Sequence, residues 1–207
     1  MIQLINVFKR YGEKTILDNV CYTFEKGSVY IINGKNGSGK STLLNIIAGY
    51  IKPDSGTIII DDEQSIGYVY QEDLLLTNLT VEENFYLKYL ASKNINLNWY
   101  KCQKEEIFRI LNLQKLKDKK VSFLSGGEKK RLQFAQLLLS QPHVFLLDEI
   151  FSALDEESEN AVIRILEKIS KDKIIIIVSH KELNFKIETI SLKLEEGRLI
   201  LNDKRSL

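Results

Sequence analysis

The residues with the clearest chemical capacity form an eight-residue stretch that matches the pattern GxxxxGK[ST]. Glycines in this pattern let backbone N–H groups converge on phosphate oxygens, and the amino end of the following helix adds a favourable dipole. The lysine is expected to reach the β- and γ-phosphates, and the serine is expected to ligate Mg²⁺. The alternative is a glycine turn without a ligand, but the lysine and the serine stand in register with the glycines. The predicted nucleotide-binding residues are Asn33, Gly34, Lys35, Asn36, Gly37, Ser38, Gly39, Lys40, Ser41 and Thr42.

A pair of acids, Asp148 and Glu149, follows the apolar run at residues 144–147. An acid at the carboxyl end of a parallel strand, beside a phosphate loop, stands where this class of sheet binds its ligands. Asp148 is suited to hold Mg²⁺ through a water molecule, because that ion gives up its hydration reluctantly. Glu149 is suited to act as the general base for an attacking water. The alternative is that the two acids only cap the following turn.

A second glycine motif, Ser125-Gly126-Gly127-Glu128, precedes an amphipathic segment. The spacing S-x-x-E before an apolar run predicts a capping box at the start of a helix. A capped helix start with exposed glycine N–H groups is also an anion site. Both interpretations can hold together.

The elements that must position these residues follow from the hydrophobic pattern. Strands are predicted at residues 2–7, 16–24, 29–32, 56–60, 66–70, 144–147 and 174–178. Helices are predicted at residues 40–50 and 156–169, with a helical pattern over 81–113. Two short apolar runs that flank a helix are typical of parallel strands buried on both faces. The sequence therefore predicts an α/β fold with a mainly parallel P-loop core, an antiparallel β lobe and a helical insertion at about 72–140, all in a single domain of residues 1–207.

Composition limits the kind of partner. With 29 basic and 28 acidic residues, the chain carries a formal charge of +1 and has no global field that attracts nucleic acid. The basic run between Lys115 and Arg131 is interpreted as a solvated helical face rather than a nucleic-acid site. The longest aliphatic run, at 174–178, is too short to span a bilayer, and the amino end lacks an export signal. We expect a cytoplasmic protein whose membrane role would need a partner.

Seven elements, taken in order, resemble the ATP-binding cassette (ABC) family, specifically the nucleotide-binding subunit of ABC transporters. They cover nearly the whole chain: Tyr11, the phosphate loop, Gln71, LSGGE at 124–128, FLLDE at 145–149, SALD at 152–155 and His180. The resemblance implies that ATP and Mg²⁺ are the cofactors. It also implies that two cassettes dimerise head to tail, so that the serine and glycines of LSGGE in one cassette cover the ATP held by the phosphate loop of the other.

The resemblance also implies roles for single residues. Tyr11 would stack on adenine, and Gln71 would contact Mg²⁺ and the attacking water and sense the membrane partner. Asp155 would lie across the dimer interface. His180 would bind the γ-phosphate and orient the water, although from the residues alone it is equally an ordinary histidine at a strand end.

The sequence departs from the family pattern in three places. Glu128 stands where glutamine is commoner, but either side chain completes a capping box. Ile150 stands where proline often follows the glutamate, which removes no reacting group. The short stretch between Lys40 and Gln71 suggests a trimmed β lobe.

We therefore expect a cytoplasmic ATPase subunit that is peripheral on the inner face of the membrane, bound to a second cassette and to a separate transmembrane permease. ATP binding would close the dimer and hydrolysis would reopen it. The alternative is a soluble cassette that powers assembly work, such as iron–sulfur cluster scaffolding, and the sequence leaves this open. A DNA-repair or translation cassette would need a long coiled-coil insertion or two fused cassettes, and the chain shows neither.

Overall fold

The structure is a computed structural model that describes residues 1–61, 64–92 and 96–202. The strands in chain order are β1 (Ile2–Tyr11), β2 (Lys14–Phe24), β3 (Ser28–Asn33), β4 (Ser55–Ile60), β5 (Ile66–Val69), β6 (Val144–Asp148), β7 (Ile174–Val178), β8 (Thr189–Glu195) and β9 (Arg198–Leu201). The α-helices are α1 (Lys40–Ile47), α2 (Val81–Ala91), α3 (Leu97–Ile110), α4 (Gly126–Ser140) and α5 (Glu156–Ile169). Helices α2, α3 and α4 lie between β5 and β6 in the chain.

The described strands form two sheets. One has three antiparallel strands in the order β2-β1-β4, and the other has six strands in the order β5-β6-β7-β3-β8-β9. Strands β5, β6, β7, β3 and β8 are parallel to their neighbours, and β9 runs antiparallel to β8. The α/β fold with a mainly parallel sheet and an antiparallel β lobe, predicted from the sequence, is confirmed. Parallel pairing also brings the carboxyl ends of β5, β6, β7 and β3 to one edge of the sheet.

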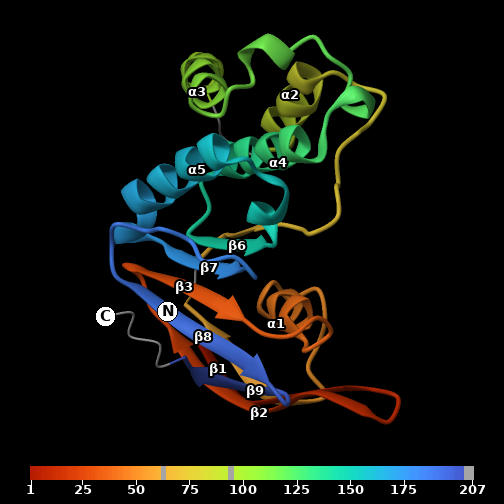
Figure 1. Ribbon diagram of the computed structural model, residues 1–207, viewed down its shortest axis with the longest axis vertical. Coiled ribbons are helices and arrows are strands. Elements are labelled where there is room, and N and C mark those ends of the chain that lie inside the picture. The colour runs from red at the N-terminus through yellow and green to blue at the C-terminus, as the bar shows by residue number, and fades with distance from the viewer. Residues whose placement is uncertain (62–63, 93–95, 203–207) are drawn as a thin grey trace.

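The six-stranded sheet is covered on both faces, and its residues alternate between two cores. Val144 and Leu146 pack with helix α1 and the three-stranded sheet. Phe145 and Leu147, from the same strand, pack with α4 and α5. Figure 1 shows α4 and α5 along one side of β6 and β7, with α2 and α3 farther out. Burial on both faces explains why β6 and β7 are continuous apolar runs rather than alternating ones.

Some elements differ from the sequence prediction. The helical pattern over 81–113 is two helices. Helix α2 ends at Ala91, before Ser92, whose backbone is extended, and α3 begins after Asn96, whose side chain accepts from the Asn98 N–H at 2.8 Å. Residues 93–95 of that prediction lie outside the described ranges. Helix α1 ends before the predicted boundary because Gly49 takes a left-handed φ of 77°. No helix in the described ranges is both long and apolar enough to cross a membrane.

Strands β8 and β9 are absent from the sequence prediction. The sequence signal for β8 is weak, because its apolar alternation covers only Ile190, Leu192 and Leu194. The last two of these residues are buried. The turn between them, Glu196-Gly197, has positive φ at both residues, as tight hairpins require. β8 pairs with β3 in parallel and so supports the strand that leads into the phosphate loop.

Candidate functional site

Four loops that carry predicted site residues meet at one edge of the sheet. The loop 34–39 follows β3, Gln71 follows β5, Glu149 follows β6 and His180 follows β7. In the sheet register Val178 lies between Ile32 and Asp148, and Val69 pairs with Leu147. The strands therefore end level with one another. This arrangement brings together residues that are more than a hundred positions apart in the chain.

The phosphate loop leads directly into helix α1. Gly39 precedes the helix with a φ of 104°, and a Cβ at this position would lie 2.6 Å from Cγ2 of Ile16. Only glycine fits this backbone and this contact. Lys40 is buried, and its Nζ donates to the carbonyl oxygens of Gly34 at 2.9 Å and Lys35 at 3.1 Å. Burial lowers the pKa of Lys40, and the nearby charges of Glu149 and Asp148 oppose this shift.

Asp148 is a buried carboxylate with one free oxygen. Its Oδ2 accepts from the Tyr68 hydroxyl at 3.2 Å, and it also forms a hydrogen bond with the Ser41 side chain. Its Oδ1 is buried and has no hydrogen-bond partner among the described residues. Burial raises the pKa of this carboxyl, and these two hydrogen bonds oppose the shift. A buried, unpaired carboxylate oxygen beside a hydroxyl is a donor set that suits a hard cation.

Glu149 is contacted by two other predicted residues. His180 Nε2 lies 3.1 Å from Glu149 Oε1, and Gln71 Nε2 donates to Glu149 Oε2 at 3.3 Å. Glu149 takes a left-handed φ of 51°, and its N–H donates to the carbonyl oxygen of Val178 at 3.1 Å. A non-glycine residue in this conformation is held there by its surroundings. Both carboxylate oxygens therefore have a fixed direction at the edge of the sheet.

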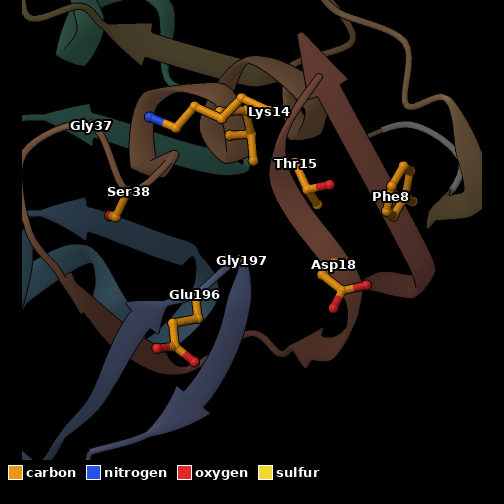
Figure 2. A pocket seen from close by; sticks show the side chains of 9 residues that line it. Phe8, Lys14, Thr15, Asp18, Gly37, Ser38, Glu196 and Gly197 are labelled. Carbon is orange, nitrogen blue, oxygen red and sulfur yellow. The ribbon is translucent and has the colours of Figure 1, made fainter. Parts of the chain in front are cut away.

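A hollow of about 380 Å³ adjoins the phosphate loop on the side of the β lobe. Figure 2 shows Lys14, Ser38 and Glu196 around it, from β2, the loop and the β8–β9 turn. The Ser38 hydroxyl is buried without a hydrogen-bond partner among the described residues, so a ligand could satisfy it. Tyr11, at the end of β1, is half-exposed, with Lys9 Nζ 5.5 Å from its ring centroid.

The second glycine motif begins helix α4. The Ser125 side chain accepts from the Glu128 N–H at 3.2 Å, and the Glu128 carboxylate accepts from the Ser125 N–H at 2.7 Å. The predicted capping box is thus present. Helix α4 packs on the face of the sheet opposite to α1, so the structure does not bring this motif to the phosphate loop of its own chain.

The backbone of this motif contacts the segment before Asp155. A Cβ at Gly127 would lie 2.6 Å from the carbonyl oxygen of Ala153, in the 3-10 helix Ile150–Ala153. Asp155 itself caps α5 by accepting from the Ser158 N–H at 2.8 Å, and this hydrogen bond lowers the pKa of its carboxyl. Gly127, in the first turn of α4, and Asp155, the N-cap of α5, therefore belong to neighbouring helix starts.

We predict that Gly127→Ala destabilises the chain relative to Gly126→Ala. Both changes gain helix propensity, but only at position 127 does the new methyl meet a backbone oxygen; at 126 it lies 3.8 Å from the Ala153 Cβ. The difference in free energy of unfolding should be about 1–3 kcal/mol, measured by urea denaturation of the two variants. Equal stability of the two variants would contradict this close approach.

The sequence analysis missed three residues that support the site. Tyr68 contacts Asp148, and Lys130 and Gln133 on α4 donate to backbone carbonyls of the loop that contains Gln71. The interpretation of the basic run as a solvated face is wrong for Lys130, because this lysine is only 6% exposed. Its position one helical turn before Phe134 and two before Leu137 was the signal that could have revealed it.

Comparisons with known proteins agree with this geometry. The profile of the family described as ABC transporter matches residues 17–152. The chain is 37% identical to the ABC transporter ATP-binding protein YybJ of Bacillus subtilis, over 99% of this chain and 97% of that protein. It is 35% identical to the zinc import ATP-binding protein ZnuC of Rickettsia bellii, over 87% and 76% of the two chains.

The fold is also similar to a solved cassette. The dimeric structure of a post-hydrolysis state of the ATP-binding cassette MJ0796, bound to ADP and Pi, has a TM-score of 0.85 and 28% identity, and the match covers 96% of each chain. The profile match spans more than half of the chain, and the similarity to YybJ spans nearly all of both proteins. The chain therefore belongs to the ATP-binding cassettes of ABC transporters and is an ATPase whose hydrolysis of ATP drives transport.

Proposed function

We propose that two cassettes of this kind form a head-to-tail dimer, each ATP lying between the phosphate loop of one chain and the Ser125 motif of the other. The observation that carries this proposal is the placement of α1 and α4 on opposite faces of the six-stranded sheet. The capped start of α4 exposes Ser125. Such a helix start, which lies on the other face of the sheet from α1, is suited to a phosphate held by another chain. The relatives include dimeric cassettes.

Within this arrangement Lys40 and the backbone of the phosphate loop bind the β- and γ-phosphates, and Tyr11 stacks on adenine. The Ser41 hydroxyl would ligate Mg²⁺, and the unpaired oxygen of Asp148 would hold the ion through a water molecule, with Gln71 nearby. The ion would neutralise charge that develops on the phosphate oxygens.

The proton of the attacking water passes to Glu149. Glu149 takes this proton because its carboxylate is fixed by Gln71 and His180 at the edge of the sheet. His180 also contacts the γ-phosphate, and Asp155 lies at the dimer interface. Residues 72–140 act as the helical subdomain of one ATPase domain formed by residues 1–207.

A groove beside Gln71 is the proposed contact with the permease. It encloses about 290 Å³ and is lined by side chains that include Tyr50, Tyr68, Tyr70 and Leu74. The Tyr68 and Tyr70 rings stack with centroids 4.1 Å apart, and Tyr50 and Leu74 are 64% and 65% exposed. A groove that combines exposed aromatic and aliphatic side chains with polar ones such as Lys88 and Gln136 is suited to a short helix from a membrane protein. The subunit would then lie in the cytoplasm, on the inner face of the membrane.

The choice of cargo is proposed to belong to the permease. Relatives of similar identity carry names for different cargoes, zinc in Rickettsia bellii and tyrosine in Clostridioides difficile. The alternative left open by the sequence, a soluble cassette for assembly work such as iron–sulfur cluster scaffolding, disagrees with the transporter family to which the chain belongs. The exposed groove also suits a membrane partner, because a cassette without one would need another protein to cover it.

The test of the permease proposal is co-purification from detergent-solubilised membranes. The tagged chain should bring an integral membrane protein with it, at a fixed ratio of subunits. Recovery only from the soluble fraction, without an integral membrane protein, would contradict the permease contact.

The groove itself can be tested by Leu74→Glu. A carboxylate in place of this exposed leucine should remove the permease from the purified complex and abolish transport, while basal ATP hydrolysis of the isolated chain stays unchanged. The matched control is Leu201→Glu, because Leu201 is 63% exposed on β9 and does not line the groove. Retention of the permease by the Leu74→Glu chain would exclude this groove as the contact.

A further inference from the structure

Two side chains of α4 hold three consecutive backbone carbonyls of the loop that contains Gln71. Lys130 Nζ donates to the Tyr70 carbonyl at 3.0 Å and also to the Gln71 carbonyl. Gln133 Nε2 donates to the Glu72 carbonyl at 3.0 Å. These contacts join positions about 60 residues apart in the chain.

The burial of Lys130 makes these contacts strong. The residue is only 6% exposed, and its ammonium also lies 3.1 Å from Gln133 Oε1 and 3.3 Å from Asp73 Oδ1. A buried charge is tolerated only when it is paired and hydrogen-bonded, and charge-assisted hydrogen bonds are about twice as strong as neutral ones. If the loop left α4, the Lys130 ammonium would lose the carbonyls that pair with it.

Each end of this connection carries a site residue. On the loop, the Gln71 side chain donates to Glu149 Oε2 at 3.3 Å. On the helix, Lys130 lies little more than one turn from the amino end that Ser125 caps. Lys130 therefore holds the backbone from which the Gln71 side chain reaches Glu149.

We propose that Lys130, assisted by Gln133, is a positioning residue that fixes the Gln71 loop to helix α4. The Gln71 amide is thereby held against Glu149, the proposed base. This inference rests on the proposed function for the roles of Gln71 and Glu149 in hydrolysis. The contacts within the chain are independent of the permease.

The first test is Lys130→Met in the isolated full chain, with Lys129→Met as the matched control. Methionine is similar in length but cannot hold the carbonyls, whereas Lys129 contacts the loop only through an ion pair with Asp73 at 3.5 Å. Misplacing Gln71 should lower kcat for basal ATP hydrolysis by about 10- to 100-fold, with KM for ATP little changed because the phosphate loop is untouched. Lys129→Met should keep the wild-type kcat.

A second measurement separates positioning from general destabilisation. If Lys130 acts through Gln71, the Lys130→Met/Gln71→Ala double variant should hydrolyse ATP no more slowly than the slower single variant. Hydrogen exchange of the amides at 71–74 should also be faster in Lys130→Met and unchanged in Lys129→Met. Fully additive losses of ATPase rate in the double variant would overturn the proposal. Wild-type hydrogen exchange of the loop amides in Lys130→Met would also overturn it.

If Lys130→Met does not fold, Lys130→Arg and Gln133→Leu give the same test. Arginine keeps the charge and should retain most of the activity, whereas leucine loses the bond to Glu72 and should lower kcat and loop protection. Wild-type kcat and loop protection in Gln133→Leu would count against the proposal. The result is independent of the permease proposal. A chain that shows these changes in kcat and loop protection but captures no permease would contradict only the permease proposal.

Discussion

Glu149→Gln should lower the rate of ATP hydrolysis by about 10²- to 10⁴-fold and leave ATP binding intact. Glutamine has the size of glutamate but cannot accept the proton of the attacking water. Its side chain can keep the observed geometry, because the amide oxygen can accept from Gln71 and the amide nitrogen can donate to His180 Nε2. The loss is therefore chemical rather than structural.

With hydrolysis blocked, the ATP-bound dimer should accumulate. Light scattering after size-exclusion chromatography in ATP and Mg²⁺ should show a dimer for Glu149→Gln and a shorter-lived one for the wild type. Glu156→Gln is the matched control, because Glu156 is an exposed acid in the first turn of α5. The Glu156→Gln variant should hydrolyse ATP at the wild-type rate. A Glu149→Gln chain with near wild-type turnover, or one that stays monomeric in ATP and Mg²⁺, would exclude Glu149 as the base.

The sequence was most informative where a motif follows a buried strand. The runs at β6 and β7 are apolar without alternation, which requires a parallel sheet covered on both faces. Once β3, β6 and β7 are placed in such a sheet, their carboxyl ends must share an edge. The meeting of the phosphate loop with Glu149 and His180 at that edge follows from this topology.

The sequence was least informative where a contact depends on a distant partner. Tyr68 and Asp148 are 80 positions apart, and the hydrogen bond between them depends on the pairing of β5 with β6. Lysine is usually a surface residue, and the burial of Lys130 is favourable because its ammonium is paired with loop carbonyls, Gln133 and Asp73. The local sequence pattern does not predict such partners. It indicates which face of a helix or strand is apolar, but not which polar groups from distant segments pack against it.

Mixing two inactive variants, Lys40→Ala and Gly126→Asp, should restore ATP hydrolysis in part. Lys40→Ala removes the side chain that grips the phosphates, and Gly126→Asp places a negative charge at the helix start that faces the partner's ATP. Gly126 is preferred to Gly127, where any Cβ would meet the Ala153 carbonyl at 2.6 Å and disturb the chain itself. Each homodimer should lack activity because both of its sites carry one defect.

In a mixed dimer, one site combines both defects, but the other pairs an intact Lys40 with an intact Ser125 motif from the opposite chain. Mixing Lys40→Ala with a Lys40→Ala/Gly126→Asp chain is the control, because that dimer contains no intact site and should stay inactive. If hydrolysis requires both sites, vanadate should still trap one nucleotide per mixed dimer, on the Gly126→Asp chain whose own Lys40 is intact. Absence of both recovery and trapping would show that the motif acts within its own chain, because each chain then carries a defect in its own site.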